Sequence, residues 1–197
     1  AAAWNGTGWS PPQWVSRPGP GSQLALTGAV LRDGSWLLAW SAFDGEDDEI
    51  VWSRRSAGVW SKVERVSAPN GVPDITPALA ATPDGGAWIA WSRFERTPAT
   101  SGYRLRTARF DGGEWRSERP QGGLGSLYPS FVTDGREVPA LLYLQAEPRA
   151  WTLLTFDRAG RVEQSRENGG RRRIAAGHQL AERLRANVEI FVLHLHK

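Results

Sequence analysis

The sequence predicts an all-β protein, arranged as a β-propeller arc of about three four-stranded blades. Three observations lead to this fold class. A Gly-x-Trp pattern recurs along the chain, apolar strand-like segments alternate with Asp-Gly turns, and tryptophan is unusually frequent, with 11 residues among 197. A chain of this length is most simply one domain. We expect the blades to occupy residues 1–168 and an irregular helix-plus-strand tail to occupy residues 169–197.

The repeat is defined by an aromatic position that follows a glycine. Trp9, Trp60 and Trp115 occupy it, and Val162 takes the fourth place. These positions are separated by 51, 55 and 47 residues. Four-stranded propeller blades are about 40–50 residues long. The spacing therefore predicts one preceding strand at Trp9 and three complete blades after it.

Each repeat contains the same elements in the same order. An apolar first strand is expected at 24–31, 76–81 and 127–133, and a second strand at 36–40, 87–91 and 140–143. Between them lie Asp33-Gly34, Asp84-Gly85 and Asp134-Gly135, which supply the backbone freedom that a hairpin turn needs. A third strand is expected at 50–54, 103–110 and 151–156, and the fourth begins at the Gly-x-Trp position.

The C-terminal segment departs from this order. Residues 174–187 have apolar side chains at helical spacing, and residues 189–196 are typical of a short strand. Two interpretations stay open: the tail caps an exposed blade edge, or it is unrelated to the propeller.

Composition and charge exclude several classes of function. Without cysteine, the chain has neither disulfides nor a Cys-ligated metal site. No apolar run approaches the roughly 18 residues of a membrane span. The net charge of +3 is concentrated after Arg158, so we expect no nucleic-acid partner. The chain begins Ala1-Ala2-Ala3 without Met, which suits either a trimmed chain or an exported protein without its signal peptide; we expect a secreted or periplasmic location.

Four motifs resemble the sialidase-like, degenerate Asp-box β-propellers, which include sialidases and non-catalytic bacterial propeller lectins. They are D-x-x-P at Asp74–Pro77, P-D-G-G at Pro83–Gly86, W-I-A-W at Trp88–Trp91 and F-D-G-G-E-W at Phe110–Trp115. The resemblance covers roughly four fifths of the chain. It implies a propeller fold and a ligand-binding rim.

The sequence also departs from this family. An Asp-box reads S-x-D-x-G-x-T-W, whereas Asp111–Trp115 is one residue short and lacks the threonine. The F/Y-R-I-P arginine motif of sialidases is absent. Three blades are fewer than the six or so of such rings. We expect a longer parent protein, a homodimer that completes the ring, or an open arc with a covered edge.

Candidate ligand-binding residues lie where the loops of neighbouring blades converge. In a four-stranded blade, the loop into the first strand and the loop between strands two and three share one rim, where propellers generally bind. Aromatic rings there could stack on sugars, although most of the tryptophans are better explained as blade packing. Asp74 could instead tie down its own loop. The candidates are Trp40, Asp74, Trp91, Arg93 and Tyr128.

The acidic run 44–49 is the candidate metal site, with Asp44, Asp47 and Asp48 as possible oxygen ligands of Ca²⁺. Its spacing is not that of an EF-hand, so the interpretation we favour is a solvated loop and no cofactor. Sialidase-type hydrolysis needs a tyrosine nucleophile, but none of the three tyrosines has a recognisable catalytic context. We therefore expect non-catalytic binding of a glycan or glycoprotein. The alternatives are a fragment of a sialidase-like glycoside hydrolase and a protein-interaction scaffold.

Overall fold

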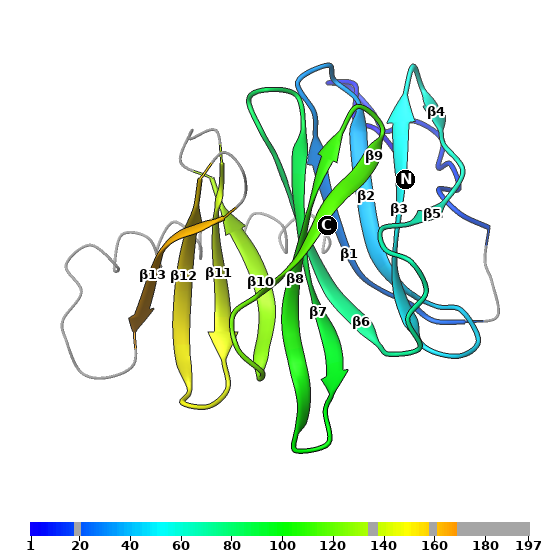
Figure 1. Cartoon of the computed structure of the whole chain (residues 1–197). Helices are drawn as coiled ribbons and strands as arrows, with labels where there is room; N and C mark the ends of the chain where they lie inside the picture. The colour runs from blue at the N-terminus through cyan, green and yellow to red at the C-terminus, as the bar shows by residue number, and fades with distance from the viewer. Residues whose placement is uncertain (18–20, 134–137, 158–160, 169–197) are drawn as a thin grey trace.

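The protein is described by a computed structural model that covers residues 1–17, 21–133, 138–157 and 161–168 (Figure 1). The regular structure of these residues is β-strand throughout, in three antiparallel sheets. No helix among them is long and apolar enough to cross a membrane. The all-β prediction is therefore confirmed for the described part of the chain. The helix and strand expected at 174–196 lie outside it.

The first sheet is built from β1 (Gln23–Val30), β2 (Trp36–Phe43), β3 (Asp48–Ser56) and β4 (Val59–Trp60) in that order, and β5 (Glu64–Arg65) also pairs with β3. The middle sheet contains β6 (Asp74–Ala81), β7 (Ala87–Arg96), β8 (Ser101–Asp111) and β9 (Glu114–Gln121). The third contains β10 (Ser126–Val132), β11 (Ala140–Gln145), β12 (Ala150–Phe156) and β13 (Val162–Asn168). Aromatic and branched apolar residues fill the second strands, as their preference for pleated, half-buried surfaces predicts.

The repeat deduced from the sequence recurs in these sheets. Trp60, Trp115 and Val162 lie in the fourth strands β4, β9 and β13. Gly34 and Gly85, in two of the expected Asp-Gly turns, have φ values of 79° and 92°, which glycine adopts without strain. The strand expected at Trp9 is not formed, because this residue makes only an isolated antiparallel bridge with Trp4.

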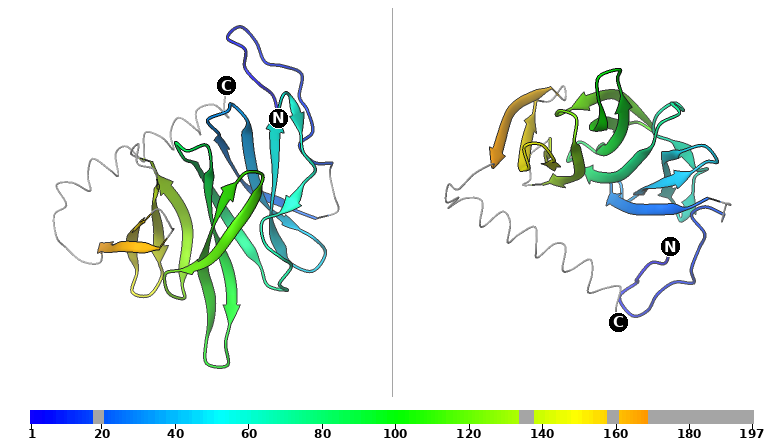
Figure 2. Two further views of the ribbon diagram at one scale, coloured as in Figure 1. Left: turned by 45° about the horizontal axis from the view of Figure 1, so that its top comes forward. Right: turned by 90° about the horizontal axis from the view of Figure 1, so that it is seen from below.

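Two hydrophobic cores lie between neighbouring sheets, which stand side by side in an arc (Figure 2). In the core between the first and middle sheets, the rings of Trp52 and Phe110 meet edge to face with centroids 5.3 Å apart. Between the middle and third sheets, Trp88 stacks on Phe156 at 6.1 Å. Each such aromatic pair adds about 0.5–1.5 kcal/mol beyond the area that it buries.

Equivalent side chains of neighbouring sheets face the same direction. Ile89 and Trp91 of β7 pack in the core toward the first sheet, whereas Trp88 stacks toward the third. Leu141 and Tyr143 take the places of Ile89 and Trp91 in β11, and they face back toward the middle sheet. Each sheet therefore packs on its predecessor by the same face, and successive sheets are related by rotation.

Candidate functional site at the rim of the sheets

One end of the three sheets gathers the loops that the sequence placed on a common rim. The β2–β3, β7–β8 and β11–β12 turns all lie at the lower end of the molecule in Figure 1. Strand pairing brings the first strands to this end, because Gln23 pairs with Ala42, Asp74 with Arg93, and Ser126 with Gln145. We call this end the rim; it comprises the three turns and the first residues of β1, β6 and β10.

Each first strand carries a β-bulge close to the rim. Regular pairing is interrupted between Leu24 and Thr27, between Ile75 and Ala78, and between Leu127 and Ser130. Within the bulges Ala25, Thr76 and Tyr128 have φ values of 53°, 51° and 53°. A side chain in this left-handed region is strained, and such residues and bulges cluster at functional sites, where they re-aim side chains.

Asp74 and Arg93 form a buried ion pair at the start of β6. The Arg93 Nε donates to Asp74 Oδ1 and its Nη2 donates to Oδ2, both at 2.8 Å. The same Nη2 donates to Ser67 Oγ at 2.8 Å, and Nη1 donates to Glu118 Oε1 at 2.6 Å. Asn70 Nδ2 adds a bond of 3.1 Å to Asp74 Oδ2. The charges of both residues are therefore compensated within the protein.

This ion pair ties several segments together. Ser41 of the first sheet donates to the Asp74 carbonyl oxygen at 3.0 Å, so the network crosses from one sheet to the next. The Arg93 guanidinium also lies 5.7 Å from the ring centroid of Trp91. The Asp74 side chain is fully buried. These contacts give Asp74 and Arg93 the role of tying down the loop before β6, and they leave little of either side chain for a ligand.

The aromatic candidates divide into buried and exposed rings. Trp91 is completely buried in the core between the first two sheets, and Trp40 is 5% exposed with its indole N–H bonded to Gln23. Neither offers a free face to a sugar, so we leave both out of the proposed binding surface. By contrast, the Tyr128 side chain is 57% exposed and Trp151, at the start of β12, is 50% exposed. The rim therefore displays these two rings.

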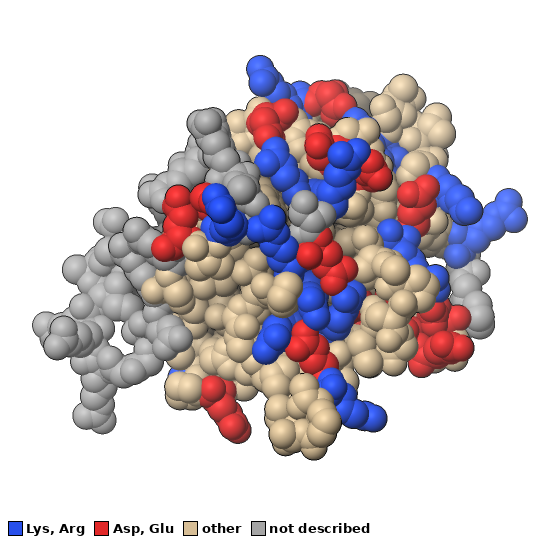
Figure 3. Space-filling model, in the orientation of Figure 1, with Lys and Arg blue, Asp and Glu red and all other residues tan. Residues whose placement is uncertain are grey.

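The acidic β2–β3 turn brings three carboxylates together. Oxygens of Asp44, Asp47 and Glu49 lie within 4.8 Å of one another. Figure 3 shows acidic side chains gathered at the lower right of the molecule, where Figure 1 places this turn. Asp44 Oδ1 accepts from the backbone N–H groups of Glu46 and Asp47, and Oδ2 accepts from Arg65 Nη2 at 2.7 Å. These bonds, the backbone ones first, hold the pKa of Asp44 below its usual value.

The other two carboxylates of this group are short of partners. Glu49 is 1% exposed, and neither of its carboxylate oxygens has a hydrogen-bond partner. Asp47 is also buried, with an unpartnered Oδ2. Burial, followed by the charges of Asp74 and Asp47, raises the pKa of Glu49 to about 7. Burial, followed by the charge of Asp44, raises the pKa of Asp47.

The sequence predicted Asp44, Asp47 and Asp48 as metal ligands. In the structure Asp44 and Asp47 lie together, and the third carboxylate of the group belongs to Glu49 and not to Asp48. Asp48 is the first residue of β3, and successive strand residues point to opposite sides. Glu49 therefore shares a side with Asp47. Strand alternation applied within the acidic run would have identified Glu49 as the ligand next to Asp47.

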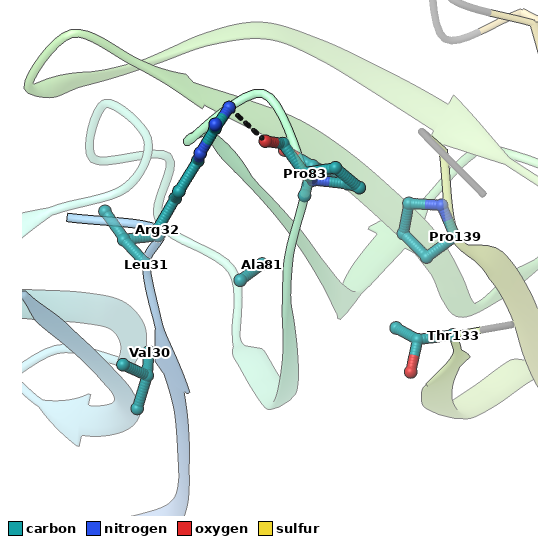
Figure 4. Close-up of a pocket in the computed structure, with 8 residues that line it drawn as sticks. Val30, Leu31, Arg32, Ala81, Pro83, Thr133 and Pro139 are labelled. Atoms are coloured by element: carbon teal, nitrogen blue, oxygen red, sulfur yellow. Dashed lines mark hydrogen bonds between the residues drawn. The ribbon is translucent and has the colours of Figure 1, made fainter. Parts of the chain in front are cut away.

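A shallow pocket of about 280 Å³ lies at the opposite end of the sheets (Figure 4). It is lined where the first and second strands of all three sheets meet, by Val30, Leu31, Arg32, Ala81, Thr82, Pro83, Thr133 and Pro139. Arg32 Nη1 donates to the Pro83 carbonyl at 3.4 Å. Since this lining includes neither a carboxylate nor a histidine, we assign it no acid or base chemistry.

Comparisons with known proteins place the fold but no activity. No model of a protein family matches the chain. No curated protein matches it significantly. The structure is similar to a solved protein of unknown function from Dyadobacter fermentans DSM 18053, with a TM-score of 0.54 and 12% identity over 75% of this chain and 54% of that one. The chain thus spans about half the length of that structure, and the likeness concerns the fold alone.

Proposed function

We propose that the three sheets are successive blades of a sialidase-like β-propeller, and that its rim binds carbohydrate or glycoconjugate without catalysis. The rotational repeat supports the first part, because every sheet packs on its predecessor through the same side-chain positions. The first strands β1, β6 and β10 lie next to one another, as the innermost strands of neighbouring blades do.

The observation that carries the binding proposal is the row of three equivalent bulges at the rim. A fold that only needed packing would place glycine where φ is positive, yet Ala25, Thr76 and Tyr128 stand there. The Tyr128 ring is thereby held out into solvent. An exposed aromatic ring fixed by the backbone is suited to stack on the apolar face of a pyranose.

The chemistry around this ring favours a sugar over an ionic ligand. Among the described residues of β10 to β12, Trp151 provides a second exposed ring, separated from the Tyr128 strand by β11. The charged groups nearest the start of β6 are already paired with each other. The ligand surface therefore offers aromatic faces more than free charge, which matches a neutral glycan better than a phosphate.

Glycan-array binding tests this proposal. We expect the wild-type protein to retain a subset of glycans, and Tyr128→Ala to weaken that binding about tenfold, a loss of roughly 1.4 kcal/mol. Tyr128→Phe should keep it, because the ring remains. Trp9→Ala serves as the matched control, since Trp9 is an exposed ring outside the rim.

Three outcomes would contradict the proposal. If no glycan is retained, or if Tyr128→Ala binds like the wild type, the sugar assignment fails and a protein-interaction scaffold is favoured. Release of the fluorophore from a fluorogenic sialoside would overturn the non-catalytic part and favour a glycoside hydrolase.

The homodimer that would complete a ring stays a prediction. β1 exposes three apolar side chains, Leu24, Leu26 and Val30, and no described sheet covers the far face of the third sheet. A second copy could cover both. We expect the solution mass from light scattering to be twice that of one chain, and a monomeric mass would contradict ring completion by this route.

A further inference from the structure

We infer that the β2–β3 turn and the start of β3 form a calcium-binding site, with Asp44, Asp47 and Glu49 as its carboxylate ligands. This site lies within the rim, but on the first sheet, and it shares no residue with Tyr128 or Trp151 of the third sheet, so calcium binding and sugar binding can be tested with separate variants. The argument rests on the spacing of the oxygens, on the burial of unpartnered carboxylates and on the ligand type.

The spacing of the three carboxylates suits one shared cation. Ca²⁺ binds oxygens at about 2.3–2.6 Å, so two of its ligands are separated by at most roughly 5 Å. The oxygens of Asp44, Asp47 and Glu49 lie within 4.8 Å of one another. The three oxygens are therefore close enough together to be ligands of one ion with at most a small adjustment of the turn.

The buried carboxylate of Glu49 points independently to a missing positive partner. A buried polar group without a hydrogen bond is unfavourable, and a buried carboxylate far more so. Glu49 is 1% exposed, both of its oxygens are unpartnered, and it lies against Asp47, whose Oδ2 is also unpartnered. A divalent cation would contact these oxygens and offset the mutual repulsion of the carboxylates.

The backbone around the turn prepares the site. The Asp44 N–H donates to the Asp47 carbonyl at 3.0 Å, which closes the turn and holds the two carboxylates on one loop. Arg65 contacts Asp44 Oδ2, so it compensates one of the three charges. Glu49 is fixed by the pairing of β3 with β2, opposite Ala42. The ligands are thus held by a turn and a strand before any ion binds.

The ligand set selects a hard cation and favours calcium. All three ligands are carboxylate oxygens, with neither histidine nor cysteine in the group. Zinc and copper prefer such nitrogen and sulfur ligands, so they are disfavoured here. Mg²⁺ requires oxygens at about 2.0–2.1 Å in a near-ideal octahedron, which limits opposed ligands to roughly 4.2 Å. Three carboxylates fixed by a turn and a strand suit the flexible coordination of calcium better than the strict octahedron of magnesium.

Calcium binding to the chelator-treated full chain tests the inference. We expect CaCl₂ to raise the melting temperature by roughly 5 °C when its concentration is about 100 times Kd. Isothermal titration calorimetry should show one site per chain, and MgCl₂ should have a clearly smaller effect.

Two variants identify the ligands, and a third controls for charge. Glu49→Gln and Asp47→Asn keep the side-chain size but should abolish the calcium-induced shift. Both should fold, because each removes a buried charge without a partner; their melting temperature in EDTA should equal or exceed that of the wild type. Glu114→Gln removes one exposed carboxylate at the start of β9 and should respond to calcium like the wild type.

The inference is overturned if the melting temperature of the wild-type protein does not respond to CaCl₂ at concentrations up to about 10 mM. A site that is still empty at that concentration would bind calcium more weakly than the weakest extracellular calcium modules. It is also overturned if Glu49→Gln and Asp47→Asn respond like Glu114→Gln, which would place any bound calcium elsewhere. An equal response to magnesium would overturn the assignment of the ion.

Discussion

The Glu49 side chain shows how one buried residue can make stability depend on pH. Its carboxyl group is buried and lies near the charges of Asp74 and Asp47, which raises its pKa to about 7 in the folded protein. The unfolded chain releases that proton near the ordinary pKa of 4.5. Between these two values the folded state binds more protons, and stability must fall as the pH rises.

We therefore predict that, in EDTA, Glu49→Gln stabilises the protein increasingly between pH 4.5 and 7, the window set by the two pKa values of Glu49. Urea unfolding of wild type and variant at several pH values measures this. The two should agree at pH values well below 4.5, where the wild-type carboxyl is neutral in both states. If the free energies of unfolding of wild type and Glu49→Gln differ by the same amount at every pH, Glu49 does not titrate as the structure indicates.

Sequence reasoning at the residue scale predicted which residues lie near the rim but not which of them are buried. Asp74 and Arg93 were expected at the rim, and the structure brings them together as an ion pair. Their pairing depends on strand register, which composition does not reveal. Trp91 and Tyr128 were both candidates by their place near strand ends. Which ring faces a core depends on the neighbouring sheet, so burial could not be read from the chain.

At the scale of single elements, the first strands combine a regular ladder with one strained residue. β1 pairs with β2 on both sides of its bulge, and Ala25 lies inside the bulge with φ of 53°. Ala25 is exposed, so packing of its methyl group can offset little of the strain. A substitution at Ala25 therefore measures mainly the contribution of backbone strain to the free energy of unfolding.

We predict that Ala25→Gly stabilises the protein by roughly 0.5–1 kcal/mol, because glycine adopts positive φ without strain. Ala29→Gly is the matched control in the same strand. Ala29 pairs regularly with Leu37, and glycine there should destabilise by about 0.5–1 kcal/mol. If urea unfolding shows a higher free energy of unfolding for Ala25→Gly and a lower one for Ala29→Gly, the backbone strain at Ala25 is confirmed. If both variants lose the same free energy of unfolding, the bulge accommodates alanine without strain.

Turn chemistry and aromatic spacing predicted most of the elements. The Asp-Gly turns and the Gly-x-Trp positions fixed the second, third and fourth strands to within a few residues. The prediction at Trp9 was wrong because a strand also needs a partner, and this residue finds only Trp4. The bulges could not be predicted, since Ala25 and Tyr128 are residues that normally avoid the conformation they adopt.

At the scale of the whole molecule, stability comes from contacts between sheets. Two separate cores hold three sheets, and an ion pair near the rim adds a polar connection between the first and the middle sheet. The sequence predicted three sheets and the order of four strands in each, but not β5, which pairs with β3 as a fifth strand of the first sheet. Ring closure could not be predicted, because it depends on what contacts the outer faces of the first and third sheets.

The two faces of β7 serve different interfaces. Trp91 belongs to the core shared with the first sheet, and Trp88 stacks on Phe156 of the third. Truncation of either indole therefore weakens one junction and leaves the other intact, so the two losses should add without coupling. It follows that the middle sheet carries both junctions, and that a change confined to one face of β7 loosens one neighbouring sheet while the other stays attached.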